Sequence, residues 1–328
     1  MHEPSGSDSD VGSDNDGSGE VVGRLAPSPT GALHLGNARS FLLAWLSARS
    51  REGALLCRIE DLDGPRIQPG SIQEAIDDLA WLGLDYDGEA RLQSPNLDRY
   101  ALALEHLKSR GMIYPCICTR SEIERSQSAP QEGLDHGLVY PGTCRDRYES
   151  GEQARAESGC EPAWRFRLPA DAVVSFQDGV HGQVVIDVAT GCGDFVVAKK
   201  DGQPAYQLAV VVDDGDSCIN EVLRGDDLLS STARQILLYR ALGFPEPRWI
   251  HVPLVLGPDG RRLAKRHGDT RLSHFRELGV RPEAITGFLA HSAGLLDGPR
   301  DLSPEDLLDF YDLARITPAP FTFDHSPW

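Results

Sequence analysis

The stretch "RLAPSPTGALHLGNARS", which runs from Arg24 to Ser40, decides the fold that we expect of this chain. A short apolar segment over 21–25 overlaps its start and predicts a β-strand. An alanine- and leucine-rich segment follows, and its large apolar side chains recur on one helical face, which predicts a helix over 37–49. The prolines and glycines between the two indicate a tight turn.

A turn of this kind, just ahead of a helix, is suited to binding phosphate. The N-terminus of a helix presents unpaired N–H groups and the positive end of the helix dipole. Gly31 and Gly36 let the backbone approach a ligand closely, and His34 can donate a hydrogen bond to a phosphate oxygen. On spacing alone, an ordinary strand–helix turn with an exposed histidine explains the stretch equally well.

The composition is typical of a globular protein. The chain has 328 residues, of which 40% are hydrophobic, and a mean hydropathy of −0.31. This length allows two domains, or one domain with a large insertion. No apolar run approaches the ~20 residues of a membrane span, and the polar, acidic N-terminus is unlike a targeting peptide. We therefore expect a cytoplasmic protein without a membrane partner.

The net charge of −18 argues weakly against a nucleic-acid partner, because such binding depends on neutralising phosphates. Part of this charge lies in residues 1–20, which contain six acidic residues and no Lys or Arg. That segment is almost free of apolar side chains, so we expect a disordered acidic tail. A local basic surface can still bind RNA, and one basic stretch comprises Arg261, Arg262, Lys265, Arg266, Arg271 and Arg276.

The order of the expected elements indicates an α/β protein. A strand over 54–59 and helices over 72–82 and 97–109 continue the alternation, which favours a right-handed parallel unit. An insertion is expected between 114 and 198, with antiparallel strands at 164–168, 173–177, 184–188 and 195–198. The α/β alternation is expected to return at 207–212, 228–241 and 251–256, and helices are expected at 272–278, 282–293 and 304–311.

The quoted stretch resembles a known family. The run His34-Leu35-Gly36-Asn37 resembles the "HIGH" signature of class I aminoacyl-tRNA synthetases, and the whole stretch resembles the opening motif of glutamyl-tRNA synthetases. Downstream, "GPDGRRLAKRHG" over 257–268 resembles their "KMSKS" loop, although Ala264 replaces the usual serine. Shorter similar segments extend the resemblance over about 21–295.

The resemblance implies a class I synthetase fold, a Rossmann-like parallel sheet with an insertion. In this scheme 21–113 and 199–270 are the two halves of the catalytic domain, the second of which holds the KMSKS-like loop. Residues 114–198 form an insertion with a zinc site, and 271–328 form a helical region that contacts an RNA stem.

The implied reaction is attack of a carboxylate on the α-phosphate of ATP with release of pyrophosphate. Such catalysis depends mostly on positioning and on electrostatic stabilisation of the phosphoryl oxygens. The resemblance implies that His34 and Lys265 are catalytic and that Mg²⁺ accompanies ATP. The ATP-binding residues that it implies are His34, Gly36, Asn37 and Lys265.

The amino acid implied by the resemblance is glutamate, which carries two carboxylates and an ammonium group. Arginine binds a carboxylate through two parallel hydrogen bonds, so Arg24 and Arg224 would take the carboxylates while Glu60 pairs with the ammonium. The implied pocket comprises Arg24, Leu25, Ala26, Pro27, Ser28, Glu60, Tyr206 and Arg224.

Simpler interpretations of this pocket remain open. Arg224 could instead pair with Asp226 or Asp227, and Tyr206 could be an ordinary core residue. Asp61 and Asp63 could form a metal pair, although a solvated strand end explains them better. Val210 also stands where related glutamyl enzymes often carry a polar residue.

Three cysteines indicate a metal site. The thiolates of Cys116, Cys118 and Cys144 would suit tetrahedral zinc, with His136 or Asp146 as the chemically ordinary fourth ligand. Free buried thiols without a metal are the alternative. The spacing Cys-x-Cys…Tyr-x-x-x-Cys, however, resembles that of the glutamyl-Q tRNA(Asp) synthetases. This resemblance implies one structural Zn²⁺ held by Cys116, Cys118, Tyr140 and Cys144.

About 60 residues follow the second motif, so we expect no anticodon-binding domain. This too resembles the glutamyl-Q family, which attaches glutamate to queuosine at the wobble position of tRNA(Asp). Because no separate anticodon domain would signal to the active site, we expect glutamyl-adenylate to form without tRNA. The implied partners are ATP, L-glutamate and the anticodon stem-loop of that tRNA, bound by a monomer. The alternatives are a truncated glutamyl-tRNA synthetase that charges tRNA(Glu), and a non-catalytic RNA-binding protein with a synthetase-like fold.

Overall fold

The structure is a computed structural model that describes residues 20–29, 31–62, 64, 67–126, 139–263 and 269–323. Several expectations fall outside these ranges: the acidic tail over 1–19, the alternative metal ligands Asp63 and His136, and the KMSKS-like residue Lys265.

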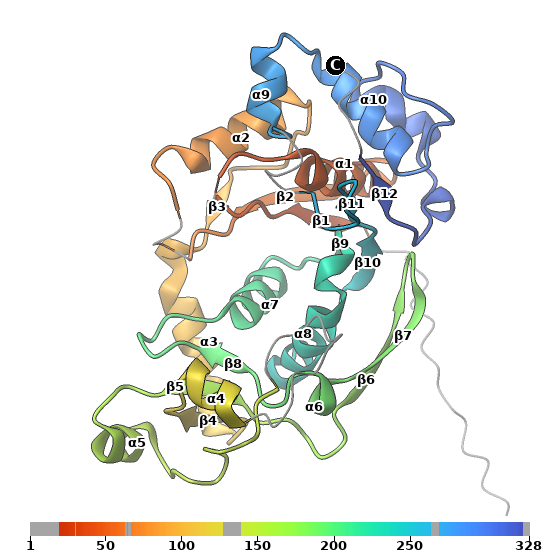
Figure 1. Cartoon of the computed structure of the whole chain (residues 1–328). Coiled ribbons are helices and arrows are strands. Elements are labelled where there is room, and N and C mark those ends of the chain that lie inside the picture. The colour runs from red at the N-terminus through yellow and green to blue at the C-terminus, as the bar shows by residue number, and fades with distance from the viewer. Residues whose placement is uncertain are drawn as a thin grey trace, which may run out of the picture.

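A parallel sheet lies at the centre of the fold (Figure 1). Its first half has the order β1 (Val22–Leu25), β2 (Ala54–Ile59) and β3 (Arg91–Leu92), and its second half pairs β9 (Glu221–Gly225) with β10 (Arg248–Val252). Asn220, just before β9, joins the halves: its backbone N–H donates to the Val22 carbonyl (3.0 Å), and its side chain accepts from the Val22 N–H (2.8 Å). The expected parallel α/β sheet is confirmed.

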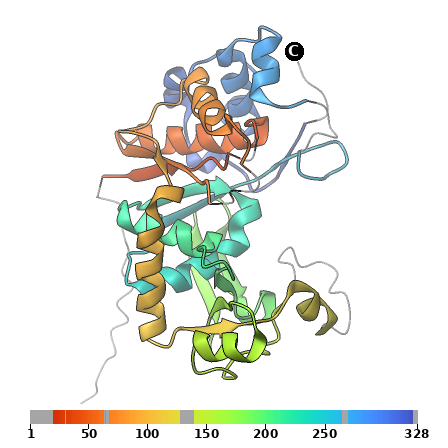
Figure 2. The same ribbon diagram turned by 90° about the vertical axis from the view of Figure 1, so that its left-hand side faces the viewer.

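Two apolar cores cover the two faces of this sheet. Along β9 and β10, Leu223 and Ile250 face one core while Val222 and Trp249 face the other, as the alternation of a strand requires. The first core includes α1 (Leu35–Arg49) and α10 (Pro282–Ser292), and α2 (Ser71–Trp81) packs on its side. The second includes α3 (Leu97–Ser109), α7 (Tyr206–Asp216) and α8 (Leu229–Leu242). Figure 2 shows the long α3 leading away from the sheet toward β4.

One expected strand is a helix. The segment 207–212 lies inside α7, and the strand of this unit is β9. All residues over 207–214 are buried, so α7 has no polar face that would mark a helical period. The sequence of a short apolar run that is buried on all sides fits a strand and a helix equally well. This ambiguity explains why a strand was expected at 207–212.

The segment between the halves of the sheet contributes to two different sheets. The strands β4 (Ile113–Cys116), β5 (Ala163–Phe166) and β8 (Val196–Ala198) form a small antiparallel sheet. The hairpin of β6 (Val173–Asp178) and β7 (Gly182–Asp187) instead joins the central sheet, because β6 pairs in parallel with β10. The short helices of this region are α4 (Arg120–Ser126), α5 (Gly151–Ser158) and α6 (Val188–Gly191).

The C-terminal region packs on the α1 side of the sheet. Its helices are α9 (Leu272–Glu277), α10 and α11 (Pro304–Leu307), close to the expected positions. An unexpected parallel pair, β11 (Val255–Leu256) with β12 (Phe321–Thr322), ties the end of the described chain back to the segment after β10. Among the described residues, no helix is long and apolar enough to cross a membrane.

Candidate active site

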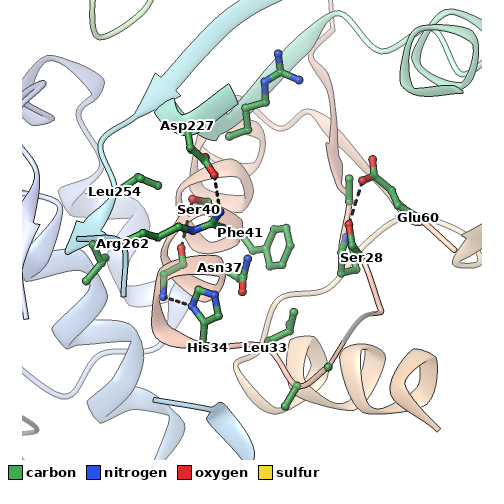
Figure 3. Close-up of a pocket in the computed structure, with 18 of the residues that line it drawn as sticks. Ser28, Leu33, His34, Asn37, Ser40, Phe41, Glu60, Asp227, Leu254 and Arg262 are labelled. Atoms are coloured by element: carbon green, nitrogen blue, oxygen red, sulfur yellow. Dashed lines mark hydrogen bonds and ion pairs between the residues drawn. The ribbon is translucent and has the colours of Figure 1, made fainter. Parts of the chain in front are cut away.

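A cavity of about 650 Å³ opens at the carboxyl ends of β1 and β9. These neighbouring strands belong to different halves of the sheet, and ligands of open α/β sheets bind at such a switch point. The cavity is lined by the end of β1, the start of α1, the end of β9, the 3₁₀ turn η3 (Asp226–Leu228) and the segment that follows β10 (Figure 3).

Most of the residues expected in the glutamate and ATP sites line this one cavity. They are Arg24, Ala26, Pro27, Ser28, His34, Gly36, Asn37, Glu60, Tyr206 and Arg224. Among the expected residues that the structure describes, Leu25 alone does not line the cavity, because its side chain is fully buried in the α1-side core. Tyr206 is 40% exposed, so it is not an ordinary core tyrosine. Other residues that line the cavity, including Ser40, Phe41, Gln68 and Asp227, were not predicted as site residues.

His34 is the N-cap of α1 and is neutral. Its Nδ1 accepts a hydrogen bond from the Gly36 N–H (3.1 Å), and burial together with the nearby Arg262 lowers the pKa of its imidazole to about 4. Because Nδ1 accepts, the proton of the neutral ring lies on Nε2, which can donate to a ligand. Glycine at position 36 leaves room for this close contact, since a Cβ there would lie 3.0 Å from Cε1 of His34.

An ion pair lies beside the entrance to α1. Arg262, from the start of the KMSKS-like segment, contacts the carboxylate of Asp227 in η3 at 2.8 Å (Figure 3). Asp227 therefore pairs with Arg262, and Asp226 lies 3.8 Å from Nε2 of His181. Among the described residues Arg224 bonds to neither carboxylate, so that simpler interpretation of Arg224 is wrong.

Arg224 is buried, with 5% of its surface exposed, and it has a free N–H group. Its Nε donates to Nε2 of His251 (3.1 Å) and its Nη2 donates to the hydroxyl of Thr232 (2.9 Å). Its Nη1 has no hydrogen-bond partner among the described residues. Burial lowers the pKa of Arg224, and the positive charge of Arg24 lowers it further.

Arg24 is the second buried cation of the cavity. Its Nη1 donates to the Leu223 carbonyl (3.1 Å), and its Nε lies 3.8 Å from the carboxylate of Asp214 without a hydrogen bond. Asp214 supplies Arg24 with a nearby negative charge, but the buried N–H group of Arg224 has no partner among the described residues, which is costly unless an anion joins it. The cavity is therefore suited to a ligand with carboxylate or phosphate groups.

Glu60 supplies a negative charge to the same cavity. Its carboxylate accepts from the Ser28 hydroxyl (3.3 Å, Figure 3) and from Arg58 (3.2 Å). Arg58 is also paired with Asp214, so it is occupied by protein carboxylates. The cavity thus offers cations and an anion together, as a zwitterionic ligand requires.

Asp61 is not a solvated strand end, and its expected metal-pair partner, Asp63, lies outside the described residues. Asp61 is buried, and its carboxylate accepts from the backbone N–H groups of Gln93 (2.9 Å) and Ser94 (2.8 Å) and from the Ser94 hydroxyl (2.5 Å). Its role is to hold the turn after β3.

The three expected cysteines come together in the insertion. The Sγ atoms of Cys116, Cys118 and Cys144 lie within 4.8 Å of one another, and those of Cys118 and Cys144 are 3.5 Å apart. The hydroxyl of Tyr140 lies 3.4 Å from Sγ of Cys116 and 3.7 Å from Sγ of Cys118. Asp146, by contrast, is exposed and paired with Arg167 at 2.6 Å.

This donor set fits tetrahedral zinc. With Zn–S near 2.3 Å and Zn–O near 2.0 Å, a tetrahedron places two sulfurs ~3.8 Å apart and a sulfur and an oxygen ~3.5 Å apart. The observed separations are close to these values. Arg165 donates to Sγ of Cys116 (3.2 Å) and lies 3.7 Å from the ring centre of Tyr140, so it holds two of the four groups.

The chain is similar to known proteins. The family model of the class I tRNA synthetases (E and Q), catalytic domain, matches residues 20–298. The glutamyl-Q tRNA(Asp) synthetase of Symbiobacterium thermophilum is 48% identical over 92% of this chain and 95% of its own length. That of Rhodopirellula baltica is 47% identical over 93% and 97%. Glutamate–tRNA ligase 2 of Halorhodospira halophila is 39% identical over 92% of this chain and 63% of its own length.

The fold agrees with solved structures as well. A glutamate–tRNA synthetase from Elizabethkingia anophelis superposes with a TM-score of 0.80 at 28% identity, over 93% of this chain and 68% of that one. The chain therefore belongs to the class I tRNA synthetases of the E and Q group, and within that group to the glutamyl-Q tRNA(Asp) synthetases, which are class I synthetase-type ligases.

Proposed function

We propose that this protein activates L-glutamate with ATP as glutamyl-adenylate and transfers the glutamate to queuosine in tRNA(Asp). The observation that carries this proposal is the buried Arg224, whose Nη1 has no hydrogen-bond partner among the described residues and which lines the cavity together with Arg24 and His34. The names of the relatives with the higher identities support the same substrate and the same RNA.

In this proposal the cavity binds glutamate by its charges. Arg224 takes the side-chain carboxylate, Arg24 takes the other carboxylate, and Glu60 pairs with the ammonium group. Ser28 and Tyr206 line the same space, together with Ala26 and Pro27. Leu25 acts only as core support for this wall.

ATP binds at the start of α1. Nε2 of His34 donates to a phosphate oxygen, and Gly36 and Asn37 line the wall beside it. Lys265, outside the described residues, would approach the triphosphate from the KMSKS-like loop, and Mg²⁺ would neutralise part of the phosphate charge. Catalysis then rests on placing the glutamate carboxylate beside the α-phosphate and on stabilising the charge of the leaving pyrophosphate.

Activation is expected to proceed without RNA. Protein groups alone hold both arginines, since Leu223, His251 and Thr232 accept their hydrogen bonds. ATP–pyrophosphate exchange with glutamate should therefore occur in the isolated protein. A strict requirement for tRNA would contradict this prediction.

The RNA substrate is tested by transfer of labelled glutamate. Transcripts and native preparations of tRNA(Asp), with and without queuosine, are compared with tRNA(Glu). We expect label only on tRNA(Asp) that contains queuosine. Charging of tRNA(Glu) would instead identify the protein as a glutamyl-tRNA synthetase, and absence of both exchange and transfer would indicate a non-catalytic RNA-binding protein.

We further propose that Cys116, Cys118, Tyr140 and Cys144 hold one structural Zn²⁺. When bound, the metal would link the turn after β4 to the segment around Cys144, inside a small apolar core that also includes Tyr114, Ile123 and Tyr148. Because metal binding of this kind stabilises the folded state, its loss should destabilise the small sheet.

The zinc proposal is tested by metal analysis and thermal unfolding. Purified protein should contain about one zinc per chain, and Cys144→Ser should lose it and unfold at lower temperature. Tyr140→Phe keeps the ring against Arg165 but removes the oxygen, so it should weaken zinc retention against a chelator. Cys218→Ser, at an exposed position, is the matched control and should keep parental zinc content. Full zinc content in Cys144→Ser would exclude this donor set.

A further inference from the structure

Three buried side chains from neighbouring strands form a continuous line that ends in the cavity. Arg224 on β9 is paired in register with His251 on β10, and Asp178 at the end of β6 is paired in register with Trp249, two residues before His251. Nδ1 of His251 lies 2.6 Å from Oδ2 of Asp178, and Nε2 of His251 lies 3.1 Å from Nε of Arg224. The side chains of Asp178 and His251 are fully buried.

Asp178 determines which nitrogen of His251 carries the proton. Its Oδ1 accepts from the backbone N–H groups of Val180 (3.0 Å) and His181 (2.9 Å), and its Oδ2 accepts from the backbone N–H of His251 (3.1 Å). A carboxylate can only accept, so Nδ1 of His251 must be the donor. Burial lowers the pKa of His251 to about 4, so the ring is neutral and its Nε2 lone pair faces Arg224.

Thr232 on α8 completes the arrangement. Its hydroxyl accepts from Nη2 of Arg224 at 2.9 Å and lies 2.9 Å from Nε2 of His251. Within the described residues, none of the hydrogen bonds of Arg224 goes to a carboxylate. The guanidinium is thus held at two nitrogens by neutral groups, while its third nitrogen, Nη1, stays unpaired.

We propose that Asp178, His251 and Thr232 form a positioning relay that orients Arg224 toward a carboxylate of the amino-acid substrate and leaves its positive charge for that carboxylate. The relay rests on the proposed function, because it assigns a purpose to the same cavity. Asp178 acts through the tautomer of His251 and does not touch the guanidinium. A carboxylate in the place of His251 would fix the guanidinium equally well, but it would already neutralise the charge that the substrate needs.

Asp178→Asn tests the tautomer directly. The amide oxygen should stay on the N–H groups of Val180 and His181, which leaves the NH₂ group facing Nδ1 of His251. The histidine proton should then move to Nε2, where it opposes the N–H of Arg224. We expect the KM for glutamate in ATP–pyrophosphate exchange to rise about 10-fold or more, the scale of losing a hydrogen bond to a charged group. The KM for ATP should stay within about twofold of the parent, since His34 and Asn37 lie elsewhere in the cavity.

A matched pair at His251 keeps the test independent of how well Asp178→Asn folds. In His251→Gln the side-chain oxygen reaches the place of Nε2 and can accept from Arg224. In His251→Asn the shorter amide reaches only the place of Nδ1 and leaves Arg224 without its acceptor. We expect His251→Asn to raise the KM for glutamate as Asp178→Asn does, and His251→Gln to recover most of the parental value.

Three outcomes are distinguished. In the expected result, the KM for glutamate separates the variants while kcat at saturating glutamate is largely kept, and ¹⁵N NMR of the imidazole shows the tautomer change in Asp178→Asn. If the parent shows no glutamate-dependent exchange, the proposed function and the relay fall together. If the parent is active but both Asp178→Asn and His251→Asn keep its KM for glutamate, the relay is overturned and the proposed function stands.

Discussion

Arg224→Gln is expected to lower kcat/KM for glutamate activation by about 100-fold or more. The variant removes a cation from a buried position where the substrate carboxylate is its expected counter-charge, and a hydrogen bond between charged groups is worth about 1.5–3 kcal/mol. The same change should narrow the preference for glutamate over glutamine. In the parent, glutamine leaves the buried donors of Arg224 facing its NH₂ group, so it should be activated at least ~100-fold less efficiently.

The measurement is ATP–pyrophosphate exchange with each amino acid as the variable substrate. Arg240→Gln is the matched control, because Arg240 lies on α8, half-exposed, and pairs with Glu246 at 2.7 Å far from the cavity lining. It should keep parental kinetics. Parental activation of glutamate by Arg224→Gln would show that Arg224 does not bind a substrate carboxylate, and the pocket assignment would be wrong.

Local sequence patterns predicted the elements that surround the opening stretch. The strand over Ala54–Ile59 and the helix over Leu97–Ser109 have the expected bounds. The strand is a short, mostly apolar run, the helix repeats apolar side chains along one face, and turn residues lie near their ends. Several of the residues that line the cavity near β1 and α1 followed from the same stretch, although Ser40 and Phe41 on α1 did not.

Contacts between distant segments were beyond such patterns. The strand β6 was expected in the insertion, yet its parallel pairing with β10 places Asp178 behind the cavity. Nothing in the neighbourhood of His251 in the sequence indicates this contact, because the two residues are 73 positions apart. Register between parallel strands is set by the whole sheet, and so the relay behind Arg224 required the structure.

The second large effect is expected at His34. His34→Asn should lower the rate of exchange by about 100-fold, the scale of losing one donor to the charge that develops in the transition state. Asparagine is a favourable N-cap and can still accept from the Gly36 N–H, so α1 should keep its stability. What the variant loses is the Nε2 donor, which asparagine does not reach. His34→Ala loses the cap as well and should unfold about 1 kcal/mol more easily.

The pH dependence separates a neutral donor from a charged one at this position. The pKa of His34 is lowered from 6.5 to about 4, so the imidazole is neutral throughout the range from pH 6 to 8. The ratio of the parental rate to the His34→Asn rate should therefore be constant across that range. If phosphate binding required the imidazolium, the ratio would instead fall as pH rises from 6 to 8, because the charged fraction of His34 falls. A falling ratio would therefore show that Nδ1 is protonated and no longer accepts from the Gly36 N–H. A constant ratio with unchanged stability in His34→Asn would assign the loss to the Nε2 hydrogen bond alone.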